Sequence, residues 1–261
     1  MDLGIKGKTA LVLGAGGGLG SAIAQTLATE GARVALADID SEALSRVQSR
    51  IEAAAGVALS RQWDLADLAS IGQHVGEIEK KLGPVDILVN NTGGPPPTPA
   101  SGQDLQVWRR FFDSMVLSVI GVTDRVIPGM RARKWGRVVT SASSGVIAPI
   151  PNLGISNSLR LTLIGWSKTL AREVAGDGVT VNVVVPGRIA TDRIRFLDEQ
   201  KAARESRSVE EVSRESINAI PRGRYGLPQD YADMVAFLAS ARADYVTGST
   251  VRVDGGLIAS I

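Results

Sequence analysis

Short apolar runs recur along the whole of this 261-residue chain. They are rich in Val, Ile, Leu and Ala and show little alternation with polar residues, which is typical of strands buried on both faces of a parallel sheet. The clearest runs cover residues 9–13, 33–37, 87–89, 137–140 and 179–185.

Segments of helical length lie between these runs, with apolar positions that follow the helical period. They cover residues 21–30, 41–55, 68–82, 105–130 and 155–175. The alternation of strand and helix predicts an α/β fold, a Rossmann-like, doubly wound parallel sheet with helices on both faces. We expect residues 1–261 to form a single domain, because α/β folds of this length commonly remain undivided.

Two segments depart from the alternation. Residues 195–218 are highly charged and helix-permissive, and they fit either a flap over a pocket, extending over residues 192–220, or an exposed pair of helices. Residues 95–99 contain four prolines, which fix φ and predict a stiff, extended loop. We interpret this loop as a rigid wall beside a site, with a polyproline ligand for a partner as the alternative.

Composition excludes several classes of function. The chain has no cysteine and one histidine, His74, so disulfides and zinc sites built from Cys and His are ruled out, and we expect no metal. The net charge is +2 with basic and acidic residues interspersed, which gives no patch for nucleic acid. The N-terminus lacks the apolar segment of a signal peptide, and no apolar run is long enough to span a membrane. We therefore expect a cytoplasmic protein without nucleic-acid or membrane partners.

A glycine-rich turn joins the first predicted strand to the first helix. In this context glycines allow a tight turn, and the backbone N–H groups and helix N-terminus can bind a pyrophosphate, as in dinucleotide-binding proteins. The candidate residues of the turn are Gly14, Gly16, Gly17, Gly18, Leu19 and Gly20.

A carboxylate follows the second predicted strand. Asp38 lies about 20 residues beyond the glycines, where it could accept hydrogen bonds from the adenosine ribose hydroxyls. It would repel the 2′-phosphate of NADP, and the neighbouring Ile39 supplies no cation to bind that phosphate. The pattern predicts NAD rather than NADP, with a simple turn at Asp38 as the alternative.

Several separated motifs then match one family in order. With Gly14, Gly18 and Gly20, they make the chain resemble the short-chain dehydrogenase/reductase family, and within it the 3-oxoacyl-ACP reductases. The resemblance implies that Asp64 and Leu65 contact adenine, that Asn91, Thr92 and Gly93 follow the fourth strand beside the cofactor, and that Pro186, Gly187, Ile189 and Thr191 form the loop that holds the nicotinamide amide. Residues 246–248 and 253–256 match its C-terminal signature.

The resemblance fails at the catalytic residues. The family usually uses an asparagine, a serine, a tyrosine and a lysine four positions after the tyrosine. In this chain Met115 stands at the asparagine position, Ser143 matches the serine, and Ser156 and Arg160 replace the tyrosine and lysine. Ser141 and Ser144 are alternatives to Ser143 if the strand ends elsewhere.

These replacements bear directly on proton transfer. A serine hydroxyl is a far weaker acid than a phenol, and Ser156 could instead be a helix N-cap. Arg160 could hold the cofactor ribose or a substrate carboxylate, but a guanidinium does not exchange protons usefully. The three tyrosines lie in the C-terminal part of the sequence, which we expect to be far from Ser156. His74 is interpreted as a surface residue.

Three hypotheses follow. The leading one is an NAD(H)-dependent oxidoreductase for a carbonyl or secondary alcohol, with Ser143, Ser156 and Arg160 as candidate catalytic residues. The second is a lyase, dehydratase or isomerase that keeps NAD bound, and the third is an NAD(H)-sensing or regulatory binding protein. The resemblance also implies a homotetramer assembled through residues 105–130 and 155–175.

Overall fold

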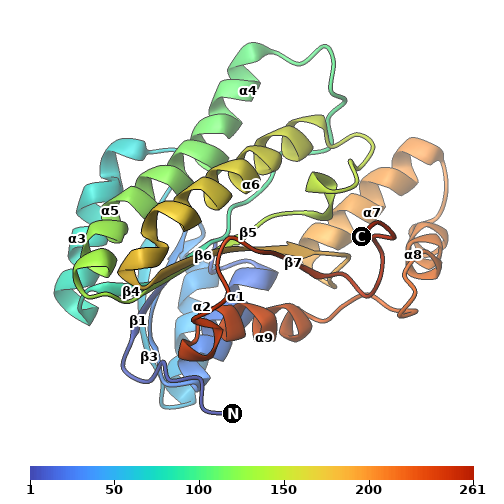
Figure 1. Cartoon of the computed structure of the whole chain (residues 1–261). Helices are drawn as coiled ribbons and strands as arrows, with labels where there is room; N and C mark the ends of the chain where they lie inside the picture. The colour runs from blue at the N-terminus through green and yellow to red at the C-terminus, as the bar shows by residue number, and fades with distance from the viewer.

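The computed structural model describes residues 1–261, which build one sheet of seven parallel strands (Figure 1). The strand order is β3-β2-β1-β4-β5-β6-β7, so the chain starts in the middle and winds outward in both directions. The strands are β1 (Thr9–Leu13), β2 (Arg33–Asp38), β3 (Val57–Gln62), β4 (Val85–Asn90), β5 (Gly136–Ser141), β6 (Val179–Pro186) and β7 (Thr250–Val253). The predicted doubly wound α/β fold is confirmed.

Helices cover both faces of the sheet, and each face has its own apolar core. Ala10 and Val12 of β1 pack toward α1 (Gly18–Thr29), α2 (Ser41–Ala53) and α9 (Pro228–Leu238). Leu11 and Leu13 point the other way, toward α3 (Ile71–Leu82), α5 (Ser118–Ala132) and α6 (Gly154–Val174). Alternate residues of one strand thus enter two different cores, as the pleat of a strand requires. None of the helices has both the length and the apolar character needed to cross a bilayer.

Two elements differ from the sequence pattern. The strand β3 is not among the runs that the pattern picks out, because it lies at the sheet edge and its side chains are only partly buried. The long helix expected over residues 105–130 is interrupted: α4 (Leu105–Phe112) is followed by a π-helical turn, Asp113–Leu117, before α5 begins. Such π-helical turns are frequent at functional sites.

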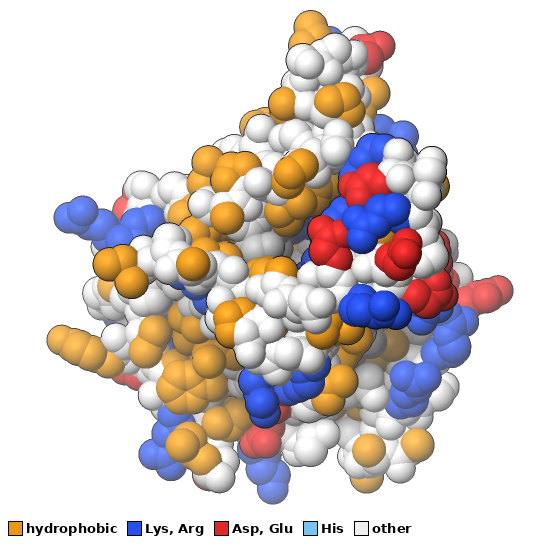
Figure 2. Space-filling view, turned by 90° about the vertical axis from the view of Figure 1, so that its right-hand side faces the viewer, with side chains coloured by type: hydrophobic (Ala, Val, Ile, Leu, Met, Phe, Trp, Pro, Cys, Tyr) orange, Lys and Arg blue, Asp and Glu red, His pale blue; other side chains and the backbone are white.

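The charged segment forms the two helices α7 (Asp192–Glu205) and α8 (Val209–Asn218), which lie beyond the carboxyl ends of the strands (Figure 1). Thr191 caps α7 and Ser208 caps α8, the latter through a reciprocal capping box with Glu211. Acidic and basic side chains lie side by side on the face that bears these helices (Figure 2). One buried carboxylate, Asp198, accepts hydrogen bonds from Arg188, Ser213 and Tyr225, and so ties α7 to its neighbours.

Candidate functional site

A cavity of about 1040 Å³ lies at the carboxyl ends of the strands. The residues that follow β1, β4, β5 and β6 line its floor, and Pro97, residues 148–152 and α7 form its walls. Every residue predicted to bind a cofactor lines this cavity except Gly20, and so do the three candidate catalytic residues Ser143, Ser156 and Arg160. The carboxyl ends of parallel strands are where open α/β sheets bind ligands.

Close backbone packing explains two of the glycines in the turn. Gly14 has φ +60°, and a Cβ there would lie 2.5 Å from the carbonyl oxygen of Asn91. Gly20 packs directly on the Gly14 carbonyl, which is why it does not reach the cavity. The Asn91 amide then donates to the carbonyl oxygens of Leu13 and Gly14, at 3.3 and 3.2 Å, and holds the turn against β4.

Gly17, in contrast, has open space beside it, whereas a Cβ on Gly16 or Gly18 would lie within 3.0 Å of Ala43 or Thr191. A Cβ on Gly17 would have the Gly14 carbonyl oxygen, 3.6 Å away, as its nearest neighbour, and the residue is exposed at the N-terminus of α1. The N–H groups of Gly16 and Gly17 donate to Asp38 and to the Gly14 carbonyl, so the donors left for an anion such as a pyrophosphate are those of the first turn of α1, on Gly18, Leu19 and Gly20. The local structure fits a dinucleotide.

Asp38 sits beside the turn. Its Oδ2 accepts a hydrogen bond from the Gly16 N–H at 2.9 Å, and its Oδ1 accepts one from the Asp40 N–H at 3.1 Å. Ile39 is 61% exposed, and the residues that line this end of the cavity include Asp64 but no Lys or Arg. The Asp38 carboxylate is thus held in place by the turn.

The two candidate serines differ in their surroundings. The Ser143 Oγ accepts a hydrogen bond from the Gly145 N–H at 3.1 Å, which leaves its own hydrogen for a ligand. Ser156 is 5% exposed and its hydroxyl makes no hydrogen bond within the protein. The N-cap of α6 is Leu153, so the alternative interpretation of Ser156 as an N-cap is wrong.

Arg160 is a buried cation with no carboxylate partner. Its Nη1 donates to the Ser141 carbonyl at 3.3 Å, and its Nη2 donates to the carbonyls of Thr92 and Gly93, at 3.0 and 3.1 Å. Burial and the nearby charge of Arg193 lower the pKa of Arg160 to about 10, so it is still charged at neutral pH. The side chain thus links the ends of β4 and β5 and carries a positive charge at the cavity.

Met115 lies in the π-helical turn and points away from the cavity. It is 2% exposed and packs in an apolar cluster with Val116, Val119, Ile155 and Leu159. Its neighbour Ser114 lines the cavity instead. Met115 is therefore part of the packing between η2 (Asp113–Leu117) and α6.

One tyrosine lies closer to the site than its place in the sequence indicates. Tyr231 is fully buried, and its hydroxyl lies 2.9 Å from the Ser141 Oγ and 3.1 Å from the Val184 carbonyl, with hydrogen bonds to both. The expectation that all three tyrosines lie far from this region is wrong. The phenol does not line the cavity, however, and burial raises its pKa.

Three other polar side chains have partners within the protein. His74 is half-buried and stacks on Trp63, with ring centroids 4.6 Å apart, rather than being a free surface residue. Arg188 pairs with buried Asp198 at 2.6 Å, while Asp192 is exposed and pairs with Arg195 at 3.4 Å. These groups hold the walls of the site in place.

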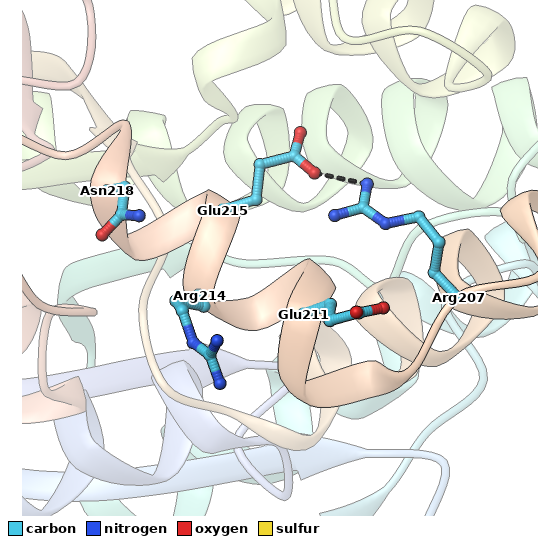
Figure 3. Close-up of a pocket in the computed structure, with 5 residues that line it drawn as sticks. All are labelled: Arg207, Glu211, Arg214, Glu215 and Asn218. Atoms are coloured by element: carbon cyan, nitrogen blue, oxygen red, sulfur yellow. Dashed lines mark hydrogen bonds and ion pairs between the residues drawn. The ribbon is translucent and has the colours of Figure 1, made fainter.

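A second hollow lies on the outer side of α8, lined by Arg207, Glu211, Arg214, Glu215 and Asn218 (Figure 3). Arg207 pairs with Glu205 and with Glu215, and Lys201 also pairs with Glu215. Most of the charged side chains in this hollow are therefore paired with one another at the surface. The candidate site is the cavity at the strand ends.

Comparison with known proteins agrees with this geometry. The family model described as enoyl-(acyl carrier protein) reductase matches residues 14–258. The 3-oxoacyl-[acyl-carrier-protein] reductase of Escherichia coli (strain K12) is 38% identical over 258 residues, which cover 98% of this chain and 99% of that protein. The chain belongs to the short-chain dehydrogenase/reductase family.

Solved structures of the family are closely similar in fold. L-sorbose reductase from Gluconobacter frateurii, complexed with NADPH and L-sorbose, superposes with a TM-score of 0.94 at 29% identity, over 100% of both chains. NAD⁺-bound xylitol dehydrogenase superposes with a TM-score of 0.90 at 27% identity, over 97% of this chain and 99% of that one. Relatives of this kind support an oxidoreductase.

Sequence reasoning missed one residue that the cavity makes prominent. Arg193, at the start of α7, donates to the Pro95 carbonyl at 2.7 Å and lines the cavity close to Arg160. In the sequence it is one of many charged residues in residues 192–220, and no local signal separates it from exposed Arg195.

Proposed function

We propose that the protein is an NAD(H)-dependent oxidoreductase that interconverts a carbonyl compound and a secondary alcohol. The observation that carries the proposal is the single cavity that contains the glycine turn and Asp38 at one end and Ser143, Ser156 and Arg160 at the other. Membership of the family supports the proposal, because similar proteins are named as reductases and dehydrogenases.

The choice of NAD over NADP rests on Asp38. Its carboxylate is fixed by Gly16 and Asp40, and a 2′-phosphate beside it would meet a negative charge with no cation in compensation. Among similar proteins, the sorbose reductase is complexed with NADPH and the xylitol dehydrogenase with NAD⁺, so the family as a whole does not decide the matter.

The residues that would hold the cofactor are those that line its part of the cavity. The glycine turn would bind the pyrophosphate, Asp38 the adenosine ribose, and Asp64 and Leu65 the adenine, while residues 91–93 and 186–191 would flank the nicotinamide ribose and amide. When bound, the cofactor supplies or accepts a hydride at its nicotinamide ring.

The chain's own side chains then act on the substrate oxygen. In reduction, hydride adds to the carbonyl carbon, the C=O π pair moves to oxygen, and that oxygen takes a proton from water to give the alcohol. The free hydrogen of Ser143 and the hydroxyl of Ser156 orient the oxygen, and the positive charge of Arg160 stabilises the negative charge that develops on it. No phenol takes part.

The direct test follows absorbance at 340 nm. The purified protein is incubated with NADH or NAD⁺ and a broad panel of ketones, β-ketoacyl thioesters, alcohols and sugars. Substrate-dependent change in absorbance supports the proposal. Tight NADH binding with no change for any member of the panel contradicts it.

A second candidate keeps NAD bound while the pocket carries out a non-redox reaction such as retro-aldol cleavage, dehydration or isomerisation. It is favoured by the absence of any tyrosine hydroxyl or lysine at positions 156 and 160. The double variant Ser156→Tyr with Arg160→Lys discriminates, since dehydrogenase activity that appears only in this variant excludes redox activity of the native chain. Its control is Ser158→Tyr with Lys168→Arg on the outer side of α6.

A regulatory binding protein, the third hypothesis, would instead show NADH binding and no turnover of any kind.

We also propose that residues 192–220 form a substrate flap and that four copies assemble through α4, α5 and α6. Ile194, Leu197 and Lys201 of α7 line the cavity, which supports the flap.

The proposed assembly is supported by exposed apolar side chains on the helices expected at the interface, namely Leu105, Phe112, Leu117 and Leu161. Gly121, in contrast, packs on Ile71 within the same subunit. Light scattering tests the assembly. We expect a mass of four subunits for wild type and a smaller particle for Leu161→Glu.

A further inference from the structure

The end of the cavity that holds the candidate catalytic residues is strongly basic. Six cations line it: Arg110, Arg160, Arg188, Arg193, Lys201 and Arg204. The only carboxylate in this part of the lining is Asp192, whose side chain is 97% exposed and paired with Arg195. Asp38 and Asp64 belong to the opposite end, beside the glycine turn.

Carboxylates outside the cavity neutralise three of these cations. Arg188 pairs with Asp198, Lys201 with Glu215, and Arg204 with Glu205. Of the three that remain, Arg110 is exposed to solvent. The two cations that are both sheltered and without a carboxylate are Arg160 and Arg193.

These two guanidinium groups converge on one backbone segment. Their Nη2 atoms lie 3.6 Å (Arg160) and 3.4 Å (Arg193) from the position that a Cβ would take on Gly94. Arg160 makes three hydrogen bonds and Arg193 one, all to backbone carbonyls, so of the five N–H donors on each guanidinium Arg160 keeps two and Arg193 keeps four. Both are thus held in position with unused donors.

Two like charges in a sheltered site repel each other. Burial and the charge of Arg193 lower the pKa of Arg160, and burial lowers the pKa of Arg193. A buried charge is normally compensated by a partner of opposite sign, because desolvation without one is expensive. An anion between the two groups would relieve both the repulsion and the desolvation.

We propose that Arg160 and Arg193 together bind a carboxylate on the substrate, so that the substrates are oxo acids and hydroxy acids. The inference rests on the proposed oxidoreductase function. Planar guanidinium groups bind carboxylates through paired, charge-assisted hydrogen bonds. Because Arg193 belongs to α7, the same contact would hold the proposed flap against the site.

The cofactor pyrophosphate is the other anion with the chemistry to occupy this pair. The first turn of α1 already offers N–H donors for a pyrophosphate at the opposite side of the cavity lining. The experiment therefore measures substrate-analogue binding and cofactor binding separately.

Binding is measured by calorimetry with the full-length protein saturated with NAD⁺. The probes are acetoacetate and levulinate, each compared with its methyl ester. Since a ketone cannot be reduced by NAD⁺, this measurement needs no turnover, and its outcome does not depend on whether the protein is an oxidoreductase. The variants are Arg193→Gln, Arg193→Lys and, as a matched control, Arg195→Gln on the same helix.

The proposal predicts that at least one acid binds wild type tenfold or more tightly than its ester. Arg193→Gln removes that preference and leaves the ester affinity and the NADH affinity within about twofold of wild type. Arg193→Lys retains part of the preference, and Arg195→Gln retains all of it. Thermal melting of each variant confirms that it is folded.

Three results overturn the proposal. One is that neither acid binds, or that acid and ester bind equally. Another is an acid preference that survives in Arg193→Gln. The last is that Arg193→Gln loses NADH affinity while the ratio of acid affinity to ester affinity is unchanged. This result would assign Arg160 and Arg193 to the cofactor pyrophosphate. Absence of turnover at 340 nm together with selective acid binding would contradict only the oxidoreductase function.

Discussion

The Tyr231 hydroxyl lies 2.9 Å from the Oγ of Ser141, whose carbonyl accepts a hydrogen bond from Arg160. A phenol therefore stands directly behind the candidate site although the helix α6 carries none. It faces the core, since Tyr231 is fully buried and also bonds to the Val184 carbonyl. We assign it the role of fixing the end of β5, because its two hydrogen bonds join α9 to β5 and β6.

Removal of this hydroxyl tests that assignment. Tyr231→Phe keeps the ring but loses the two hydrogen bonds, which should lower the free energy of unfolding by about 1 kcal/mol and the melting temperature by about 3 °C. We expect NADH binding and any turnover to stay within about threefold of wild type. A folded Tyr231→Phe variant without turnover would instead identify Tyr231 as part of the proton path.

The same tyrosine predicts a pH dependence. Burial raises the pKa of Tyr231 above its ordinary value of 10.0, so above about pH 10 the unfolded chain loses this proton while the folded chain keeps it. Stability must then fall as pH rises, because the unfolded state binds fewer protons. Denaturant titrations at pH 8 and pH 10.5 should show the advantage of wild type over Tyr231→Phe shrinking. A constant difference would contradict this account.

Two glycines of the turn should respond differently to the same substitution. A methyl group on Gly20 would overlap the Gly14 carbonyl, so Gly20→Ala should destabilise the fold by about 3 kcal/mol. A methyl group on Gly17 meets nothing closer than 3.6 Å and projects where a pyrophosphate would bind. Gly17→Ala should keep the melting temperature and weaken NADH binding at least tenfold. Unchanged NADH affinity would place the cofactor elsewhere.

Asp38 should set the preference between cofactors. Asp38→Asn keeps an oxygen that can accept from the Gly16 N–H but removes the charge, so the ratio of NADPH to NADH affinity should rise about tenfold, or 1.4 kcal/mol. Asp40→Asn is the control, since Asp40 caps α2 outside the cavity lining and asparagine is an equally good cap. Fluorescence titration with both cofactors measures the ratio. If wild type prefers NADPH, the proposed role of Asp38 is wrong.

The buried carboxylate Asp198 should control the order of the proposed flap. Asp198→Ala leaves Arg188 without its partner and removes acceptors for Ser213 and Tyr225, which should cost about 2 kcal/mol. We expect proteolysis within residues 192–220 to accelerate while the sheet is unaffected. Asp192→Ala, an exposed change on the same helix, should leave proteolysis at the wild-type rate. Equal rates in Asp198→Ala and wild type would show that the network does not hold α7.

The local sequence was sufficient for the fold, and it located the glycine turn and Asp38 that the structure brings to one end of the cavity. The strand β1 is a continuous buried run and α2 follows the helical period, while the spacing from Gly14 to Asp38 is set by one helix, α1, and the strand after it, β2. The edge strand β3 has a weak pattern because partial burial does not demand continuous apolar residues. Its position could be inferred only from the topology.

The chemistry of the other end depends on contacts between distant segments, which a single sequence does not display. Arg193 meets Pro95 and approaches Arg160 only because α7 folds over the ends of β4 and β5. Tyr231 reaches Ser141 from α9, 90 residues away in sequence. Met115 and Ser156 could be located by counting, but their directions could not: one packs in an apolar cluster and the other faces the cavity.

Transfer of isotope from the cofactor is the most direct test of the central claim that this site moves a hydride without a phenol. NADH carrying deuterium at nicotinamide C4 is incubated with the protein and the panel of ketones and oxo acids, and the products are analysed by mass spectrometry. The account predicts an alcohol with deuterium on the former carbonyl carbon, in an amount equal to the labelled NADH consumed. A product at the oxidation level of the substrate, unlabelled and formed without loss of NADH, would contradict it.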